Sequence, residues 1–358
     1  MKENKFDICI IGAGLIGLSI AYRLSKHYKN IIVVEKEPSF GRHISSRNSE
    51  VIHSGFYYPS NSLKSSLCVE GNNLLYEFAE KYKIKHNKCG KLIVAHNIED
   101  VSELEKIKSN SIANNVYCEI LSSDDSRKIE PRVKAMQSLW IPSTGIIDTH
   151  SLMSKLQFLS INNDVSFLYN TSINNITINN NQYILKLDEE EIYSDIVINC
   201  AGLWADKISS MLNINQYNLK FYKGDYYKCS SIRDLNCLIY PIPTIASLGI
   251  HSVLSLNGDV SFGPNLYEVS NIDYSVDDRY HDDYYLEVNR FLDIKKEDIY
   301  PDFSGIRPKI KFTDNFNDFI IKNESNAGYE NFINLIGIDS PGVTSCLAIA
   351  NYVNDILK

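Results

Sequence analysis

Short apolar runs of strand length dominate the hydrophobic pattern at the N-terminal end of the chain. Residues 7–11 (DICII) and 31–35 (IIVVE) are two such runs, and runs of this kind are typical of buried parallel strands. Between them, residues 15–27 carry apolar side chains at helical spacing. A strand, a helix and a strand within about thirty residues form a βαβ unit, which predicts a parallel sheet covered by helices.

The rest of the chain continues the alternation of strands and helices. Helical patterns cover residues 63–83, 99–114, 277–294 and 343–357. Apolar strand patterns cover residues 91–95, 196–200, 220–228, 238–240, 251–262 and 332–336. Residues 163–187 alternate apolar and polar side chains around asparagine-rich turns, a pattern typical of a β-meander. We therefore expect an α/β fold.

Composition narrows the classes of function. The chain has 358 residues, 44% of them hydrophobic, and a formal net charge of −8. An acidic chain lacks the concentrated positive surface that grips nucleic acid, so we expect no nucleic-acid partner. No apolar run approaches the ~18 residues of a spanning helix, although peripheral membrane contact stays open. The eight cysteines form no C-x-x-C pair, which favours a reducing, cytoplasmic location, and no cluster has metal-ligand spacing.

A glycine motif joins the first strand to the first helix. Residues 12–17 read GAGLIG, in which Gly12 permits a tight turn, Gly14 lets the backbone approach a pyrophosphate and Gly17 allows close helix–strand packing. Free N–H groups at the helix N-terminus favour the phosphates. Glu35 at the end of the second strand accepts hydrogen bonds from ribose hydroxyls and repels a 2′-phosphate. The motif predicts a site for NAD or FAD and disfavours NADP.

Two further features favour FAD. The motif stands at the N-terminal end of the chain, and a second strand that ends in glycine follows far downstream at residues 199–202. Near the C-terminus, residues 332–336 lead through Ser340, Pro341 and Gly342 into a helix. The N-terminus of a helix placed there stabilises negative charge on a reduced flavin ring.

A polar segment at residues 43–71 offers groups that bind anions and transfer protons. They are Arg47, His53, Tyr57, Tyr58 and Lys64. Arginine and lysine supply positive charge, histidine exchanges protons near neutral pH, and tyrosine donates hydrogen bonds. This set within a short span predicts a site for a small anionic substrate.

The chain resembles the L-2-hydroxyglutarate dehydrogenase/oxidase family, within the D-amino-acid-oxidase-like FAD-dependent oxidoreductases. The segments that carry the resemblance follow one order along nearly the whole chain and include SSRNSEVIHSGFYYPSNSLKSSLCVEG and NCAGLWAD. They are residues 12–18, 45–71, 89–95, 143–152, 199–206, 223–227, 239–243, 305–310 and 337–350. The chain is shorter than the best-known members, and its GIRPKI segment and compact C-terminus are similar to a short bacterial subgroup.

The resemblance implies a Rossmann-like FAD-binding domain assembled from discontinuous segments and a mixed-sheet substrate domain. We expect the FAD-binding domain at residues 1–80, 140–215 and 300–358, and the substrate domain at residues 81–139 and 216–299. The resemblance also implies FAD contacts at Gly12, Gly14, Gly17 and Glu35. The flavin-ring contacts that it implies are Ser46, Arg47, Asn48, Ser49, Ala201, Gly202, Gly337, Ser340, Pro341, Gly342 and Val343.

Two histidines are candidates for the chemistry. A 2-hydroxy acid loses its hydroxyl proton as hydride leaves C2, and the neutral imidazole of His53 is suited to accept that proton. The alternative is a histidine that packs beside the flavin or orients it. The resemblance places His53 and Tyr58 on the active-site side of the ring. His251 is similar in pattern to an active-site histidine of the family, and equally to a buried strand histidine.

Several other side chains are candidates for substrate binding. Arg307 follows Gly305 by two residues and directly precedes Pro308 in GIRPKI. Its guanidinium binds a carboxylate bidentately if it is not simply structural. Lys64 and Lys309 are weaker candidates for a second carboxylate. Tyr240 is a candidate for lining the pocket, as are Tyr57 and Tyr58. We expect Lys223 in KGDYY to approach the flavin, where its charge stabilises the reduced ring.

These patterns predict an FAD-dependent enzyme that oxidises a small L-2-hydroxy (di)carboxylic acid, L-2-hydroxyglutarate, to the 2-oxo acid by hydride transfer. Electrons then pass to oxygen or a quinone. An amine oxidase acting on a glycine-like or N-methyl amino acid is a second possibility, since both reactions remove hydride next to a carboxylate. A non-catalytic flavin-binding module is a third, and the polar set at residues 43–71 argues against it because a binder needs no positioned base.

Overall fold

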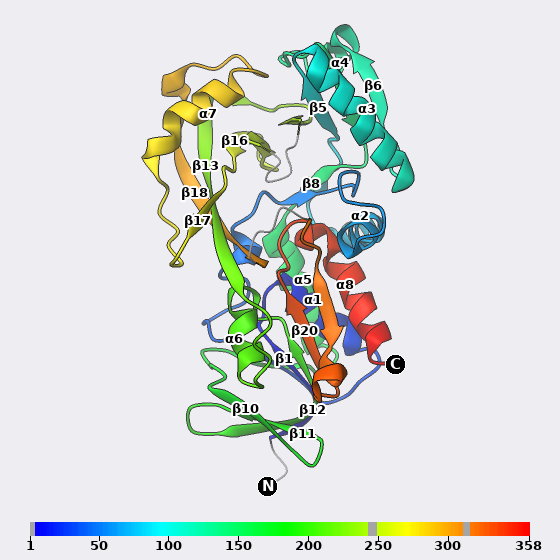
Figure 1. The fold of residues 1–358 in the computed structure, drawn as a ribbon, viewed down its shortest axis with the longest axis vertical. Coiled ribbons are helices and arrows are strands. Elements are labelled where there is room, and N and C mark those ends of the chain that lie inside the picture. Colours follow the sequence, from blue (N-terminus) through cyan, green and yellow to red (C-terminus); the bar gives the residue numbers. More distant parts are fainter. Residues whose placement is uncertain (1–3, 243–248, 311–315) are drawn as a thin grey trace. The chain divides into compact units, whose positions relative to one another are not determined.

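The chain forms two compact units, each built from discontinuous segments (Figure 1). The computed structural model describes residues 4–242, 249–310 and 316–358. Unit 1 comprises residues 1–46, 149–221 and 307–358, and unit 2 comprises residues 47–148 and 222–306. Two of the boundaries between the units fall inside long strands, β13 (Leu219–Arg233) and β18 (Ile299–Ile310).

A mostly parallel sheet forms the centre of unit 1. Strand β1 (Lys5–Ile11) pairs in parallel with β2 (Ile31–Val34) on one side and with β12 (Glu191–Asn199) on the other. Strand β9 (Ser166–Leu168) continues the sheet beyond β2, and β20 (Phe332–Ile336) pairs with the end of β12. All five strands run in parallel, as the βαβ pattern predicts.

The other edge of β12 is shared between two neighbours. Its first half pairs with β11 (Gln182–Lys186), which forms an antiparallel hairpin with β10 (Asn175–Asn179). Asn180 and Asn181 at the hairpin turn have φ of 50° and 61°, the left-handed backbone that such turns require. The meander expected at residues 163–187 is confirmed for this hairpin and wrong for β9, which joins the parallel sheet. Strand β19 (Ile320–Asn323) lies antiparallel to β20.

Helices cover the sheet of unit 1. Helix α1 (Leu15–Leu24) packs against α8 (Gly342–Ile356) and α5 (Thr149–Ile161), and it contacts β1 and β2 beneath it (Figure 1). The short helix α6 (Ala205–Ser210) packs against β12 and β20. The sequence patterns predicted α1 and α8 to within a few residues and did not predict α5.

The described residues of unit 2 form three sheets and four α-helices. A five-stranded sheet contains β13 and β18 with β15 (His251–Leu254), β16 (Asp259–Gly263) and β17 (Tyr267–Val269). A four-stranded sheet contains β14 (Leu238–Pro241), β5 (Lys91–Ala95), β7 (Gln137–Ile141) and β6 (Glu119–Ser122). A small sheet contains β3 (Val51–Ile52), β8 (Gly145–Ile147) and β4 (His86–Asn87). The helices are α2 (Leu63–Tyr82), α3 (Ile98–Ala113), α4 (Ser123–Ile129) and α7 (His281–Val288).

The division differs from the expected one mainly at residues 47–80, which belong to unit 2. Residues 140–148 and 300–306 also belong to unit 2, and residues 216–221 belong to unit 1. The amide of Asn72 in α2 donates hydrogen bonds to the carbonyl oxygens of His53 and Ser143, each at 2.9 Å. The hydroxyl of Tyr76 donates to the same Ser143 carbonyl at 3.2 Å. These bonds tie α2 and the segment before it to the turn between β7 and β8 of unit 2. Helical periodicity shows that α2 has a buried face but not which residues that face meets.

The described residues include no helix long and apolar enough to cross a membrane. Each of the eight cysteines carries a free thiol, as the scattered spacing predicts.

We expect replacement of Gly17 by alanine to destabilise the protein. The added Cβ would lie 2.0 Å from the carbonyl oxygen of Gly12, a backbone atom that cannot rotate away. Overpacking of this kind costs about 1–3 kcal/mol and outweighs the ~1 kcal/mol that alanine gains over glycine in a helix. Urea unfolding followed by circular dichroism measures the loss.

Gly14→Ala is the matched control for this prediction. Gly14 has an ordinary φ of −71°, and its Cβ would meet only the movable Ser45 hydroxyl, at 3.1 Å. We expect a clearly smaller loss of unfolding free energy in this variant. Equal stability of Gly17→Ala and the wild type would contradict the close packing described here.

Candidate cofactor and substrate sites

The turn between β1 and α1 has no room for a side chain at Gly12. Gly12 has φ of +104°, and a Cβ there would lie 2.6 Å from the carbonyl oxygen of Cys200 at the end of β12. Its N–H donates to the Val34 carbonyl at 2.8 Å. Only glycine adopts this backbone without strain and permits this approach. The turn therefore holds the start of α1 directly over the carboxyl ends of β1, β2 and β12.

A cavity of about 330 Å³ opens in unit 1 at this place. Of the residues expected to contact the cofactor, it brings together Gly12, Gly14, Glu35, Ala201 and Gly202. Gly17 lies behind the turn, against Gly12. Ligands of open α/β sheets bind outside the carboxyl ends of the parallel strands, and this cavity lies there.

Glu35 is fixed by two backbone donors. Its Oε2 accepts the N–H of Ala13 at 2.7 Å, and its Oε1 accepts the N–H of Glu37 at 2.9 Å. A carboxylate has about four lone-pair sites, so two bonds leave capacity for the hydroxyls of a ribose. The carboxylate borders the cavity, where its charge repels a 2′-phosphate.

Helix α1 directs an uncapped N-terminus at the cavity. Gly14 at its N-cap provides no side-chain hydrogen bond, and the first turn carries no acidic residue. The N–H of Leu15 binds the hydroxyl of Ser45 at 2.9 Å. The free N–H groups and the helix dipole favour a negatively charged group. Together with Glu35, these groups fit the diphosphate and the ribose of FAD.

Polar side chains of the cavity that the sequence analysis missed lie mostly around Trp204. They are Lys36, Arg42, His43, Thr171, Ser172, Trp204 and Lys207. The Lys36 Nζ lies 3.0 Å from the centroid of the Trp204 ring, and the His43 ring meets it edge-on at 4.8 Å. Thr171 and Ser172 follow β9. Had β9 been assigned to the parallel sheet, its carboxyl end would have indicated both residues.

Four expected flavin contacts, Ser46 to Ser49, do not line this cavity in the described part of the chain. The Ser46 hydroxyl donates to the Gly41 carbonyl, and the Asn48 side chain accepts the N–H of Glu50 at 2.8 Å. In unit 2, the Arg47 guanidinium lies 4.1 Å from the centroid of the Tyr274 ring, and the Ser49 and Tyr226 hydroxyls are 3.0 Å apart. Their role at the flavin stays a prediction.

The loop before α8 reaches the cavity through one residue. Ile338 lines the cavity. The predicted flavin contacts in this loop are not among the described residues that line it. Those predicted contacts are Gly337, Ser340, Pro341, Gly342 and Val343. The N-terminus of α8 carries no side-chain cap, which suits the predicted stabilisation of negative charge.

The two cations of the GIRPKI segment differ in their partners. The Lys309 Nζ lies 3.5 Å from the Asp339 carboxylate, so its charge is already balanced. Arg307 is half-buried on β18, and within the described residues its guanidinium has no carboxylate in ion-pair distance. Arg307 therefore keeps a free bidentate donor for a carboxylate, and Lys309 is a weaker candidate.

His53 of unit 2 is held as a neutral imidazole. It is partly exposed, and its backbone carbonyl is anchored by Asn72. Burial, and then the positive charges of Lys91 and His251, hold the pKa of His53 well below its usual range. A neutral imidazole near pH 7 is the form that accepts a proton.

The segment after His53 is fixed by two amides, one on the last turn of α3 and one at its C-cap. Asn110 donates to the carbonyl oxygens of Phe56 and Tyr58 at 2.7 and 3.0 Å. Asn114 donates to the carbonyl oxygens of Gly55 and Tyr58 at 3.0 and 2.8 Å. Tyr58 is thereby held in place within unit 2.

Tyr240 and His251 form a buried stack in unit 2. Their ring centroids are 3.8 Å apart and their planes differ by 20°. The Nδ1 of His251 lies 2.7 Å from the Gly249 carbonyl, so Nδ1 carries a proton and donates it. Lys64 is also buried, at the start of α2. Pro243, the last residue of the segment 239–243, lies outside the described residues.

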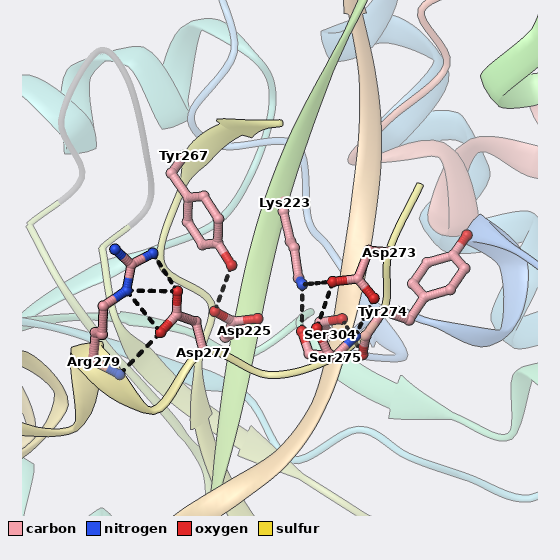
Figure 2. A network of polar contacts seen from close by, with 9 residues as sticks. All are labelled: Lys223, Asp225, Tyr267, Asp273, Tyr274, Ser275, Asp277, Arg279 and Ser304. Atoms are coloured by element: carbon pink, nitrogen blue, oxygen red, sulfur yellow. Dashed lines mark hydrogen bonds and ion pairs between the residues drawn. The ribbon is translucent and has the colours of Figure 1, made fainter. Parts of the chain in front are cut away.

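Lys223 belongs to a polar network on β13 and the segment around residues 273–279 (Figure 2). Its ammonium donates to the Ser275 carbonyl and lies 3.6 Å from the Asp273 carboxylate. Nearby, Asp225 accepts the Tyr267 hydroxyl at 2.8 Å. The ammonium thus holds this segment, and its approach to a flavin stays a prediction. No metal-binding cluster occurs in the described parts of the chain.

Known proteins resemble this chain along nearly its whole length. The L-2-hydroxyglutarate dehydrogenase of Arabidopsis thaliana mitochondria is 32% identical over 403 residues, covering 99% of this chain and 83% of that protein. The glycerol 3-phosphate dehydrogenase of Caloramator mitchellensis is 29% identical, and the match covers 99% of this chain and 74% of that protein.

Solved structures share the fold. The L-α-glycerophosphate oxidase of Mycoplasma pneumoniae, solved with FAD bound, superposes with a TM-score of 0.88 at 25% identity, over 99% of this chain and 94% of that one. The glycine oxidase of Geobacillus kaustophilus superposes with a TM-score of 0.84 at 16% identity, over 99% and 95% of the two chains.

The DAO family of FAD-dependent oxidoreductases matches residues 7–356. With the glycine turn, Glu35 and the cavity that they border, this match shows that the chain belongs to the DAO family and is an oxidoreductase that uses FAD.

Proposed function

We propose that this enzyme oxidises L-2-hydroxyglutarate, a small L-2-hydroxy dicarboxylate, to the 2-oxo acid. The observation that carries the proposal is the neutral imidazole of His53, which is partly exposed, lies near positive charges and is anchored through its backbone carbonyl. The names of the most similar relatives support the substrate, above all the Arabidopsis thaliana dehydrogenase at 32% identity over 99% of the chain.

The chemistry divides between cofactor and protein. When bound, FAD accepts the hydride that leaves C2 of the substrate. The hydroxyl on C2 loses its proton in the same reaction, and the imidazole of His53 takes that proton. Because its positively charged form is disfavoured, His53 stays ready as an acceptor at and below neutral pH.

The substrate carboxylates need cations. We assign the C1 carboxylate to Arg307, whose planar guanidinium matches the two carboxylate oxygens. Lys64 is the candidate for the second carboxylate, and Lys309 is weaker because Asp339 balances its charge. Tyr58, Tyr240 and His251 are proposed to line the site. The location is proposed to be cytoplasmic, with oxygen or a quinone as the electron acceptor.

Glycerol 3-phosphate is the second candidate substrate. The Caloramator mitchellensis relative and the Mycoplasma pneumoniae structure, at 29% and 25% identity, are named for it. Its oxidation also removes a hydride from carbon and a proton from a hydroxyl, so His53 serves either reaction. Glycine oxidase shares only the fold at 16% identity and adds no support for an amino acid substrate.

Anaerobic reduction of the bound flavin tests the proposal. We expect L-2-hydroxyglutarate to abolish the visible absorbance of the oxidised flavin, while its D-enantiomer leaves that absorbance unchanged. Glycerol 3-phosphate, glycine and N-methylglycine are tested in parallel. If glycerol 3-phosphate alone reduces the flavin, that compound is the substrate and the proposal is wrong. If the amines alone reduce it, the enzyme is an amine oxidase. If none of the compounds reduces it, the protein is a flavin-binding module.

We expect His53→Ala to retain FAD and lose turnover. General base catalysis contributes about 10²–10⁴-fold, so stopped-flow flavin reduction should slow at least a hundredfold. His86→Ala is the control, because His86 also lies in unit 2. Within the described residues its Nδ1 bonds the Ile84 carbonyl at 2.9 Å and its ring packs edge-on against Tyr76. Near-normal reduction in His53→Ala would remove this imidazole from the mechanism.

We expect Arg307→Lys to raise the Michaelis constant for the substrate. Lysine keeps the positive charge but lacks the two parallel N–H donors of the guanidinium. A hydrogen bond to a charged group is worth about 1.5–3 kcal/mol, so its loss should raise KM roughly ten- to a hundredfold. Steady-state kinetics measure the change, with Lys309→Met as the comparison that should alter KM less. An unchanged KM in Arg307→Lys contradicts the carboxylate contact.

A further inference from the structure

A fully buried polar network lies next to the cofactor cavity of unit 1. It joins four side chains that are 0% exposed, those of Asn199, Ser209, Glu324 and Asn334. None of the four is among the described residues that line the cavity, although Asn199 and Asn334 each directly precede a lining residue. Burial of polar groups is costly unless they are hydrogen-bonded. A network kept in this place therefore calls for an explanation beyond packing.

Two asparagines on neighbouring strands form the centre of the network. Asn199 is the last residue of β12 and lies opposite Asn334 of β20 in the parallel sheet. The side-chain nitrogen of Asn199 donates to the side-chain oxygen of Asn334 at 2.8 Å. The hydroxyl of Ser209 in α6 lies 2.9 Å from the same oxygen. The paired strands and the helix thus hold both amides in place.

Glu324 provides the acceptor at one end of this chain of hydrogen bonds. It follows β19, and its Oε1 accepts the side-chain nitrogen of Asn334 at 2.9 Å and the hydroxyl of Tyr217 at 2.6 Å. The Lys322 ammonium lies 3.5 Å from Oε2 and supplies the opposite charge. An ionised carboxylate only accepts hydrogen bonds, so Asn334 turns its nitrogen to Glu324 and its oxygen to Asn199. Asn199 then directs its own nitrogen to Asn334 and keeps its oxygen for another donor.

The donor at the other end belongs to the turn after β12, which forms a wall of the cavity. The side-chain oxygen of Asn199 accepts the N–H of Ala201 at 3.2 Å, and its nitrogen also donates to the Ala205 carbonyl at 2.7 Å. One side chain therefore holds both ends of this turn. Residues 200–204 line the cavity. The orientation of the Asn199 amide thus determines where this wall of the cavity lies.

We propose that Glu324 is a positioning residue for FAD: through Asn334 and Asn199, its buried carboxylate fixes the turn after β12 in the position that the cofactor needs. Glu324 acts through the two amides, since it is not one of the described lining residues. A wall that is already ordered reduces the conformational entropy that is lost when the cofactor binds. The inference concerns the cofactor and is independent of the substrate of the proposed function.

Glu324→Met tests the inference, because methionine is similar in size and removes both acceptor oxygens. Without the carboxylate, the two amides lose the group that orients them, and the turn is no longer held in one position. We expect FAD to bind about tenfold more weakly, the effect of losing roughly one hydrogen bond. Stepwise dilution of the holoenzyme measures the dissociation constant, because FAD changes its fluorescence when it leaves the protein.

Two variants separate positioning from a general loss of stability. Glu324→Gln keeps an oxygen that accepts from Asn334, and we expect it to bind FAD almost as tightly as the wild type. Glu130→Met removes another carboxylate that is 0% exposed, in unit 2, where it accepts the N–H groups of Arg132 and Asn236 at 3.1 and 2.8 Å. This variant should be less stable and keep its FAD affinity. Wild-type affinity in Glu324→Met, or an equal loss of affinity in either of the other two variants, overturns the inference.

Ser209→Ala carries the test should Glu324→Met not fold. Alanine is favourable in a helix, and this change removes only the hydroxyl beside the Asn334 oxygen. We expect FAD to bind about threefold more weakly, the lower range of what one hydrogen bond contributes. Ser210→Ala is the matched control, because Ser210 is an exposed residue of the same helix whose hydroxyl donates to the Lys207 carbonyl at 2.8 Å. Equal FAD affinities of Ser209→Ala and Ser210→Ala overturn the inference.

Discussion

The close contact between the glycine turn and the end of β12 determines the cofactor site. Gly12 lies so near Cys200 that no side chain fits between them, and Gly17 lies equally near Gly12. This contact fixes where α1 begins and directs its free N–H groups over the carboxyl ends of the parallel strands. Glu35 and the Ala201–Gly202 pair reach the same cavity from neighbouring strand ends. One steric constraint thus brings together residues that are far apart in the sequence.

Unit 2 depends on a different physical effect, the cost of charge in an apolar interior. Lys91, His53 and His251 are cationic or basic groups in a region where the thiols are neutral. Repulsion between buried cations is only weakly screened, and after burial itself the charges of Lys91 and His251 lower the pKa of His53. Within the described residues the Lys91 Nζ has no hydrogen-bond partner, which costs the core stability.

The sequence was most informative where its patterns are local. The GAGLIG turn, the strands on both sides of it and Glu35 follow from spacing and from the needs of a diphosphate, and the structure confirms their geometry. Features that depend on distant contacts were not predictable in this way. The amide of Asn72 places residues 47–80 in unit 2, and β9 leaves the meander to pair with β2. The contact of the Lys91 ammonium with the Tyr240 ring was not predictable either, since Tyr240 lies on a strand far along the chain.

In the proposed reaction, the anion contacts rather than the proton acceptor would select the substrate. Oxidation of a 2-hydroxy acid and of glycerol 3-phosphate both need a neutral base, and His53, the proposed base, would serve either. Of the two cations on the GIRPKI segment, Asp339 neutralises Lys309 and leaves the charge of Arg307 available. A single guanidinium matches one carboxylate next to the reacting carbon. A phosphate carries up to two negative charges and is better served by several donors. The charge balance on β18 therefore supports the proposed 2-hydroxy acid over glycerol 3-phosphate.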